Sequence, residues 1–406
     1  MAPTVALTFL AVLVLSINAK GIAKAPLLAS DSPTIIKNEY VVVMKEELSN
    51  QEIENHKTMV RSAMQLQGNI SKIMFEYNIG KGFRGYSVST DKMMLETLRA
   101  MSDVKYVEHN QEMHAMEECV REDNSEWGLH RTVYRETKHV DEYYEYNDGS
   151  DGTGVKVYII DTGIMIDHTE FKDRATWGTN TAGGSSTDAN GHGTHVAGTV
   201  IGDKYGLARG ATAIAVKVLG DNGSGSTVGV IEGVEYVARE HEEGKDKKSV
   251  ANMSLGGGFS KSLNDAVNAA INKGVHFAIA AGNENQDACN VSPASSKSVT
   301  VAAMDNEDKR SSFSNYGSCV EIFAPGSAIK SAWISDRGSN NKDGTATLSG
   351  TSMAAPHVAG VMAKILTTED PTPEQMMAKL ESLATDKIVQ DRKNTPDLLL
   401  FHDCKS

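Results

Sequence analysis

Ser352 lies in the stretch LSGTSMAAPHVAGVMA, residues 348–363, and its hydroxyl is a candidate nucleophile. Small and apolar residues follow it at helical spacing, so we predict a buried helix that begins near Thr351. Pro356 is compatible with the beginning of a helix, because the first-turn N–H groups have no intrahelical partner to lose. A serine in this position is most often a helix cap. It can act as a nucleophile only if a base and an acid lie beside it.

Asp161 and His192 are the candidates for that acid and that base. The stretch VYIIDTGI places Asp161 at the end of an apolar strand, where a carboxylate often caps the following turn. In NGHGTHVAGT, His192 lies between two glycines at a predicted helix start, where its side chain can reach an open cleft. His195 would complete a metal-binding pair, but no carboxylate lies at metal-ligand spacing beside it. We therefore expect His195 to pack in the core.

Together these residue types are the ones that acyl transfer requires. The serine supplies the attacking oxygen, the histidine takes its proton, and the aspartate fixes the histidine tautomer and stabilises the imidazolium. Asn283 ends the apolar stretch AIAAGN and, taken alone, is a typical turn residue. Beside the other three residues, its side-chain amide is an expected oxyanion donor, together with the N–H of Ser352 at a helix N-terminus. The Gly-x-Ser-x-Gly motif of the α/β-hydrolases is absent.

Elements that could position these residues follow from residue 153 onward. Near-continuous Val, Ile and Ala runs separated by helices indicate an α/β domain with a mainly parallel sheet covered by helices on both faces. Catalytic groups in such sheets collect beyond the carboxyl ends of the strands. The predicted strands are VKVYIID, TAIAVKVL, SVANMSL, VHFAIAAG and SVTVAAM, and the predicted helices lie near 192–202, 227–242, 260–273 and 351–366.

Residues 35–110 are expected to form a separate, small α+β unit. Its strand-like and helical stretches follow in the order β-α-β-β-α-β, which is the ferredoxin-like arrangement. They are EYVVVM, helix 48–66, KIMFEYN, GYSVS, helix 91–101 and VKYVEH. The acidic segment 110–126 carries no such pattern, so we interpret residues 111–121 as a linker with a processing site and residues 122–406 as the larger domain.

The composition of the 406-residue chain, with 40% apolar and 23% charged residues, is that of a soluble globular protein. Its net charge of −13 argues against nucleic acid or an anionic membrane as a partner. The apolar run from Val5 to Leu15 is too short to span a bilayer and ends in small residues, so we interpret residues 1–19 as a secretory signal peptide. No basic residue precedes this run, and a short buried strand is the alternative. We expect a secreted protein without a membrane span.

Six motifs, in order, resemble those of subtilisin-like serine proteases, and the longer ones resemble the proteinase K subfamily. The chain order Asp, His, Ser is also that of subtilisin. The resemblance implies a subtilisin-like fold with Asp161 as the triad acid, His192 as the base and Ser352 as the nucleophile. Asn283 would be the oxyanion donor. The N-terminal unit similarly resembles the inhibitory prodomain of the family, which acts as a folding chaperone. The motifs are DTGI, GHGTHVAGT, SLGGG, AAGNENQDACNVSPASS, SSFSNYGSCVEIFAPG and GTSMAAPHVAG, and they cover about residues 155–365.

The resemblance also implies where a substrate would lie. One segment matches the strand edge on which family substrates lie as an added strand. A second segment matches the wall of the pocket for the residue before the cut. None of its residues is acidic, so a bulky apolar or aromatic residue is expected there. The implied substrate-binding residues are Ser254, Leu255 and Gly256 for the edge and Ala280, Ala281 and Gly282 for the pocket wall.

A structural calcium ion is a further implication of the resemblance. Proteinase K relatives bind calcium with an aspartate where this chain has Glu321, and with two carbonyls that match Lys297 and Val299. Glutamate is also a calcium ligand, but its longer side chain changes the geometry. No cofactor is expected for the chemistry itself.

Four cysteines are too few for a scaffold built on disulfides, and their spacing fits no Cys-x-x-Cys pattern. An even number in a secreted protein favours two bridges. Cys289 and Cys319 match a bridge found in several relatives. Cys119 and Cys404 are then the residual pair.

The expected protein is a secreted serine endopeptidase that acts on protein substrates through an acyl-enzyme. We expect a monomer, made as an autoprocessed zymogen whose own prodomain is an intramolecular inhibitor. One alternative is a catalytically silent binding protein on the same fold, but such a protein has no physical need for all four of Asp161, His192, Asn283 and Ser352. Another is a selective processing convertase, which would place acidic walls around basic substrate side chains.

Overall fold

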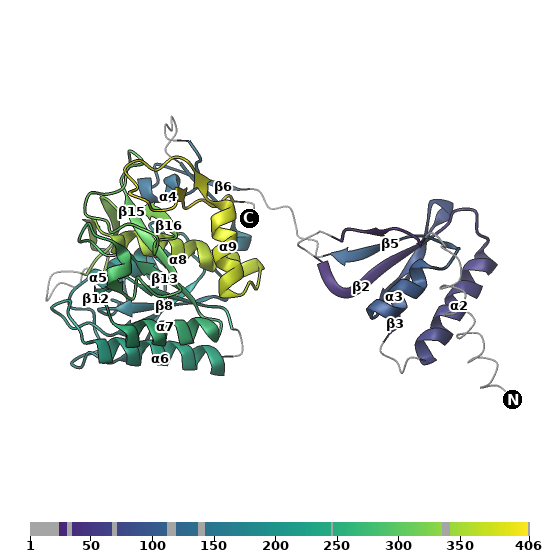
Figure 1. Ribbon diagram of the computed structural model, residues 1–406, viewed down its shortest axis with the longest axis horizontal. Coiled ribbons are helices and arrows are strands. Elements are labelled where there is room, and N and C mark those ends of the chain that lie inside the picture. The colour runs from purple at the N-terminus through teal and green to yellow at the C-terminus, as the bar shows by residue number, and fades with distance from the viewer. Residues whose placement is uncertain are drawn as a thin grey trace. The chain divides into compact units, whose positions relative to one another are not determined.

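A computed structural model of the chain describes residues 24–30, 35–66, 71–111, 119–136, 143–244, 247–334 and 342–404. The chain divides into two compact units, Met1–Met116 and Glu117–Ser406 (Figure 1). The predicted signal peptide, residues 1–19, lies outside the described residues. In the described ranges no helix combines the length and the apolar character that crossing a membrane requires.

The N-terminal unit has the predicted β-α-β-β-α-β order. Its sheet has the strand order β1-β5-β2-β4-β3, and β1 adds to the edge by pairing parallel to β5. The apolar side chains of α2 and α3 pack with those of the sheet in one core, which includes Val42, Val60 and Leu98. The ferredoxin-like prediction is therefore confirmed. The elements are β1 (Leu27–Leu28), β2 (Ile35–Met44), α2 (Asn50–Leu66), β3 (Lys72–Ile79), β4 (Phe83–Ser89), α3 (Lys92–Arg99) and β5 (Val104–Gln111).

A nine-stranded sheet forms the centre of the larger unit. Its strand order is β19-β20-β16-β15-β13-β11-β8-β10-β9, and every pairing except β19 with β20 is parallel. The strands are β8 (Lys156–Asp161), β9 (Ala175–Asn180), β10 (Thr212–Lys217), β11 (Ser249–Met253), β13 (His276–Ala280), β15 (Val299–Met304), β16 (Ile322–Pro325), β19 (Thr385–Asp386) and β20 (Leu398–Leu399).

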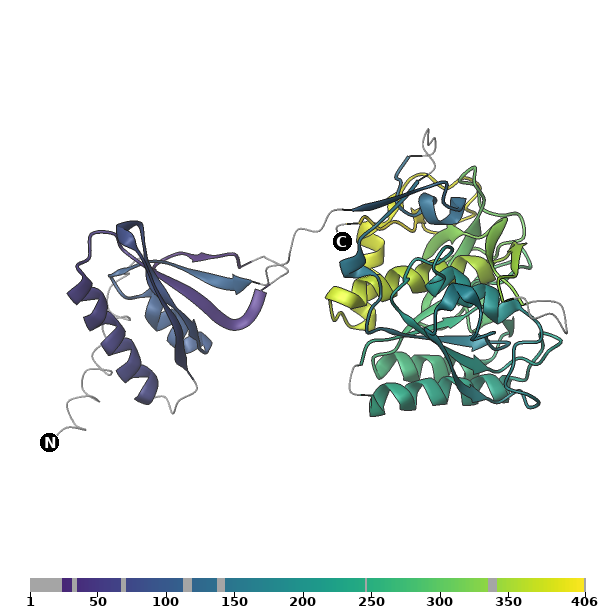
Figure 2. The same cartoon turned by 180° about the vertical axis from the view of Figure 1, so that it is seen from behind.

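Both faces of this sheet are buried, as the continuous apolar runs predict. Val157 and Ile159 of β8 lie in one core cluster with residues of two helices, α5 and α8. Tyr158 and Ile160, which point to the opposite face, lie in a second cluster with residues of α6 and α7. These two helices lie side by side along the sheet (Figures 1 and 2). The helices are α4 (Trp127–Arg131), α5 (His192–Ile201), α6 (Thr227–Glu243), α7 (Lys261–Asn272), α8 (Thr351–Thr368) and α9 (Pro373–Leu383).

Part of the predicted linker is a strand. β6 (Val120–Asp123) pairs antiparallel with β7 (Tyr143–Tyr146), so the prediction of no regular structure over 110–126 is wrong for this stretch. Tyr144 is fully buried, and Glu122 forms an ion pair with Arg209 at 2.7 Å, which anchors the hairpin to the larger unit. Two further short pairings join β12 (Gly257–Gly258) to β14 (Val291–Ser292) and β17 (Ile329–Ala332) to β18 (Thr345–Leu348).

Candidate active site

Asp161 and His192 are hydrogen-bonded to each other. Asp161 is the last residue of β8 and is fully buried, and His192 is the first residue of α5. Nδ1 of His192 lies 2.8 Å from Oδ1 and 3.0 Å from Oδ2 of Asp161. A carboxylate accepts only, so Nδ1 carries the proton and Nε2 is left as the acceptor.

The charge of the histidine follows from the same contact. Burial works to lower the pKa of His192, but the charge of Asp161 and its hydrogen bond outweigh it, and Asp188 adds to the effect. The pKa of His192 is therefore raised above its ordinary value. A raised pKa is what a base needs if it is to hold a proton taken from a hydroxyl.

Glycine residues allow α5 to begin where it does. Gly191 at the N-cap has φ +100°, a left-handed conformation that side chains disfavour. At Gly193 a Cβ atom would lie 2.1 Å from the carbonyl oxygen of Gly163. The glycines on either side of His192 therefore let the helix start approach the loop after β8, which brings the imidazole to Asp161.

Ser352 is the second residue of α8, and the N-cap position belongs to Gly350. The alternative that Ser352 is merely a helix cap is therefore wrong. Its hydroxyl donates to the carbonyl of Ser254 at 3.2 Å, and it makes no hydrogen bond to His192 or to any other described residue. The hydroxyl has to rotate away from Ser254 before it can donate to Nε2 of His192.

Pro356 is the sixth residue of α8, which is one turn later than we expected from the sequence. Its missing N–H leaves the carbonyl of Ser352 without an intrahelical donor. The hydroxyl of Ser254 donates to that carbonyl at 2.8 Å, and the side-chain amide of Asn252 donates to the same hydroxyl at 2.9 Å. Pro356 is tolerated because a side chain from outside the helix replaces the lost bond.

Asn283 lies in the loop that follows β13, close to the start of α8. Its Oδ1 accepts from the N–H of Thr351 at 2.9 Å and from the Thr351 hydroxyl at 3.0 Å. These donors identify this atom as the oxygen, so Nδ2 is on the other side. A Cβ atom at Gly350 would lie 3.5 Å from Nδ2 and 3.6 Å from the backbone nitrogen of Ser352. Two N–H donors, neither with an acceptor among the described residues, therefore flank one small space that glycine leaves open.

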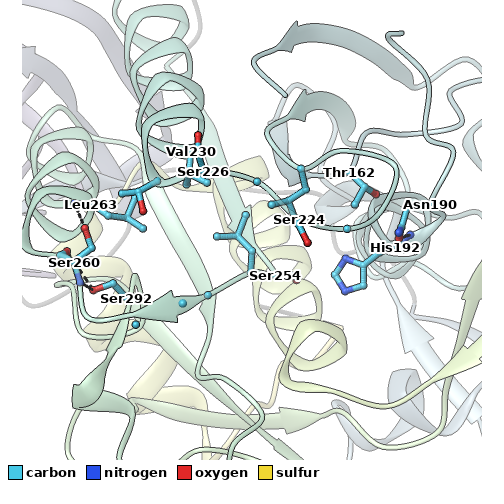
Figure 3. A pocket seen from close by; sticks show the side chains of 18 residues that line it. Thr162, Asn190, His192, Ser224, Ser226, Val230, Ser254, Ser260, Leu263 and Ser292 are labelled. Atoms are coloured by element: carbon cyan, nitrogen blue, oxygen red, sulfur yellow. Dashed lines mark hydrogen bonds between the residues drawn. The ribbon is translucent and has the colours of Figure 1, made fainter. Parts of the chain in front are cut away.

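A groove of about 460 Å³ lies beside His192 (Figure 3). The segment 223–227 forms one side and the segment 254–258 the other. β11 ends at Met253, so Ser254, Leu255 and Gly256 follow the strand and are not part of it. In the described chain, no group bonds the backbone N–H or C=O of Leu255 or Gly256. These groups are available to pair with an extended peptide.

A second hollow of about 340 Å³ borders Ser352 and shares residues 255–258 with the groove. Ala280 and Gly282, two of the residues predicted to form a substrate pocket, line it. Ala281 does not line it: this residue is fully buried in the core, because side chains alternate along an extended segment. Glu284, which sequence analysis missed, lines the hollow, and its carboxylate accepts from Nδ2 of Asn315 at 2.8 Å. The sequence feature that could have identified Glu284 is its position immediately after Asn283.

His195 is not part of the site. Its Nε2 lies 3.1 Å from the carbonyl of Ile329 and 3.2 Å from that of Ala346, and the ring is fully buried. Burial lowers the pKa of His195 to about 4, so it is neutral. Its Nε2 is occupied by the two carbonyls, and neither His195 nor His192 belongs to a group of three potential metal ligands among the described residues, so the alternative of a metal pair is wrong and the expected core position is confirmed.

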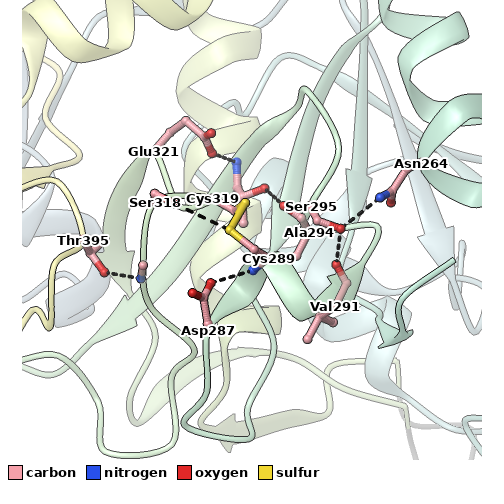
Figure 4. Close-up of a disulfide and its surroundings, with 12 residues drawn as sticks. Asn264, Asp287, Cys289, Val291, Ala294, Ser295, Ser318, Cys319, Glu321 and Thr395 are labelled. Carbon is pink, nitrogen blue, oxygen red and sulfur yellow. Dashed lines mark hydrogen bonds between the residues drawn. A yellow bond between two sulfur atoms is a disulfide. The ribbon is translucent and has the colours of Figure 1, made fainter. Parts of the chain in front are cut away.

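The region expected to bind calcium contains the half-buried carboxylate of Glu321 (Figure 4). Glu321 accepts a hydrogen bond from the N–H of Thr300 at 2.6 Å and forms no ion pair within the described residues. Burial raises the pKa of Glu321 to about 8, against the opposing effect of the hydrogen bond from Thr300. A half-buried carboxylate without an ion pair among the described residues, with carbonyls nearby in sequence at Lys297 and Val299, fits a hard cation such as calcium.

Both expected cysteine pairs are disulfide-bonded. Cys289 is joined to Cys319 (Figure 4), and Cys119 is joined to Cys404. Among the described residues, the one group of three potential metal ligands is Cys119, Glu145 and Cys404, and its two sulfurs are in this disulfide. Cys119 therefore connects the start of the larger unit to its C-terminal segment.

Comparisons with known proteins agree with this geometry. Residues 152–397 match the subtilase family, and residues 39–116 match peptidase inhibitor I9. The subtilisin-like serine protease Cur l 4.0101 of Cochliobolus lunatus is 40% identical over 93% of this chain and 82% of that protein. The subtilisin-like proteinase Spm1 of Pyricularia oryzae is 39% identical over 93% of this chain and 79% of that protein. A crystal structure of a cold-adapted subtilisin-like serine proteinase matches with a TM-score of 0.63 and 47% identity, covering 68% of this chain and 98% of that one.

Proposed function

Since this chain belongs to the subtilase family of serine endopeptidases and carries an I9 inhibitor domain as its prodomain, we propose that Asp161, His192 and Ser352 are its catalytic triad. The observation that carries this proposal is the pair of contacts between Asp161 and Nδ1 of His192, at 2.8 and 3.0 Å. They leave Nε2 as the acceptor on the side of the groove.

The reaction proceeds through an acyl-enzyme. His192 takes the proton of Ser352 as the serine oxygen attacks the peptide carbonyl, and then gives that proton to the leaving amine. Water, activated by the same histidine, releases the acyl group. Asp161 keeps the histidine in the required tautomer and stabilises the imidazolium.

Asn283 and the N–H of Ser352 are the proposed oxyanion donors. Support comes from the two donors that flank the space left open by Gly350. The N-terminus of α8 adds a favourable potential for negative charge at this point.

Protein substrates are proposed to bind as an extended strand beside Ser254, Leu255 and Gly256. The unpaired backbone groups of Leu255 and Gly256 support that geometry. The hollow beside Ser352 would receive the residue before the cut. We propose that this is an apolar or aromatic residue, since Ala280 and Gly282 leave room for it. A lysine or arginine would also be tolerated there, because the exposed carboxylate of Glu284 lines the same hollow.

Secretion, maturation and metal binding complete the proposal. The signal-like residues 1–19 would direct secretion, and Ser352 would cut its own chain between the prodomain and the larger unit. A cut before Cys119 would keep both β6 and the disulfide to Cys404 on the mature enzyme. Glu321, with the carbonyls of Lys297 and Val299, would hold a structural calcium ion that neutralises the half-buried carboxylate and takes no part in the chemistry. The mature enzyme is proposed to be a monomer.

One assay tests the central proposal. The purified secreted protein and its Ser352→Ala variant are incubated with a mixed peptide library, with and without a serine-reactive phosphonate. We expect cleavage by the wild type that the phosphonate abolishes and that the variant lacks. Cleavage by the variant at the wild-type rate would overturn the assignment of the nucleophile, and a wild type that binds peptides without cutting them would indicate a silent binding protein.

A further inference from the structure

Asp188 is a buried carboxylate four residues before His192, with an exposed fraction of 7%. It accepts five hydrogen bonds from the loop and helix around the histidine. These join Oδ1 to the hydroxyl of Thr162 at 3.0 Å and to the N–H groups of Asn190 at 3.1 Å and Gly191 at 2.8 Å, and Oδ2 to the N–H of Thr194 at 3.0 Å and its hydroxyl at 2.6 Å. A carboxylate with this many fixed partners holds the turn that leads into α5.

Thr162 connects this carboxylate to the acid of the triad. Its N–H donates to Oδ1 of Asp161 at 2.7 Å, and its hydroxyl donates to Asp188. The same hydroxyl accepts from the N–H of Gly193 at 2.9 Å, and the carbonyl of Thr162 accepts from Nζ of Lys217 at 2.7 Å. Every polar group of Thr162 is engaged, so the end of β8 and the start of α5 are held together at this residue.

We propose that Asp188 is a positioning residue for the protease reaction, which acts through Thr162 to hold His192 against Asp161. This inference rests on the triad proposed above. Asp188 does not touch the reacting atoms. It fixes two elements whose relative shift would change the geometry of the histidine, and small misplacements of this kind lower the rate of the chemical step.

The charges around His192 make a structural role and a positioning role distinguishable. Asp161 and Asp188 both favour the imidazolium, while His195 is neutral and Lys217 is paired with Asp221 at 3.2 Å. Removing the charge of Asp188 should therefore lower the pKa of His192. Thr162→Val leaves that charge in place, so a loss of kcat in this variant reports the positioning role without the electrostatic effect.

The experiment compares Asp188→Asn, Thr162→Val and Thr162→Ser, with Asp265→Asn as the charge-matched control on the exposed face of α7. Rates are expressed per active site titrated with a serine-reactive phosphonate, so inactive or unfolded molecules do not count. We expect Asp188→Asn and Thr162→Val to lower kcat about 10- to 100-fold with little change in KM. Asp188→Asn should also move the acid limb of kcat/KM to lower pH. Thr162→Ser, which keeps the hydroxyl, should restore most of the rate.

The double variant Asp188→Asn with Thr162→Val should lose little more than the worse single variant, because both break one connection. Unchanged kcat and an unmoved acid limb in Asp188→Asn would overturn the proposal. If Asp188→Asn does not fold, the comparison of Thr162→Ser with Thr162→Val tests the proposal instead. Equal losses of kcat in these two variants would overturn the positioning role of Asp188. A wild type without phosphonate-sensitive activity would instead refute the triad itself.

Discussion

Ser254 and Ser352 exchange two hydrogen bonds, since the hydroxyl of each donates to the carbonyl of the other, at 2.8 and 3.2 Å. The first bond holds the backbone of the proposed nucleophile, at the carbonyl that Pro356 leaves without a helical donor. The second holds its hydroxyl in a resting orientation. Ser254 therefore contacts Ser352 through both its side chain and its backbone.

Ser254→Ala should leave the carbonyl of Ser352 and the amide of Asn252 without this partner. We expect the free energy of unfolding to fall by about 1–3 kcal/mol, the cost of a buried polar group left unsatisfied, and kcat to fall because the nucleophile is less well placed. Thr372→Ala is the control, because it removes a hydroxyl that caps α9, away from the site. It should lower stability without lowering kcat. Equal kcat values for the two variants would contradict the role of Ser254.

Asn283→Leu should lower kcat far more than it raises KM, because an oxyanion donor acts on charge that develops in the transition state. Removing such a donor from a subtilisin lowers kcat by about 10²–10³-fold, and we take this value over from that relative. Asn283→Asp separates the two functions of the side chain, since it keeps an acceptor for Thr351 but loses the donor. It should be at least as slow as the leucine variant. A loss confined to KM would exclude the oxyanion role.

Glu284→Gln should change the preference for the residue before the cut. The carboxylate lies at the hollow and is exposed, so it should favour a lysine or arginine there only modestly. An exposed ion pair is worth about 0.2–1 kcal/mol, which corresponds to a ratio of about 1.5 to 5. We expect kcat/KM for a substrate with lysine before the cut to fall by that factor relative to one with leucine. An unchanged ratio would mean that Glu284 does not contact this side chain.

Glu321→Gln should remove a pH dependence of stability. The pKa of Glu321 is about 8 in the folded protein and 4.5 as its ordinary value, so the folded state retains a proton that the unfolded state has lost between these values. Stability without metal should therefore fall as pH rises from about 4.5 to 8, by at most about 1.4 kcal/mol per pH unit, and the glutamine variant should lack this slope. Thermal unfolding of phosphonate-inhibited enzyme measures both.

Calcium gives this variant a second readout. At pH 8 calcium should raise the Tm of the wild type by binding the ionised carboxylate, and chelation should reverse the rise. Glu321→Gln should show a much smaller rise. A wild-type Tm that does not change with calcium would refute the metal site. The pH dependence of stability would then stand as a separate result.

Ser352→Ala should accumulate as an uncut precursor that lacks only its signal peptide. The wild type should yield a product shorter by about ninety to a hundred residues, as estimated from the domain boundary. Both proteins are expressed in a secreting host whose proteases are inhibited, and their intact masses are compared. If the alanine variant is trimmed to the wild-type mass, another protease matures this enzyme. A mature N-terminus after Cys119 would contradict the proposal that the mature enzyme keeps the Cys119–Cys404 disulfide together with β6.

Much of the fold could be predicted from local sequence patterns. The predicted helix near 351–366 is α8, Thr351–Thr368, and the strand VKVYIID contains β8, Lys156–Asp161. Both have a periodicity that local burial imposes. β6 could not be predicted this way, because its four residues, of which two are acidic, are exposed or partly exposed. Its strand partner lies at Tyr143–Tyr146, and the neighbouring Cys119 is bonded to the distant Cys404.

The sequence by itself determined which residue types are available for catalysis and that they follow strand ends and helix starts, because parallel strands bring their carboxyl ends to one edge. It also determined the two-unit organisation, through the change in pattern between residues 110 and 153. The tertiary structure decided what depends on contacts between distant segments. It turned Ala281 into the core, brought Glu284 to the hollow, and supplied Ser254 as the partner of a carbonyl nearly a hundred residues away. Such contacts depend on how layers pack, and no local periodicity encodes them.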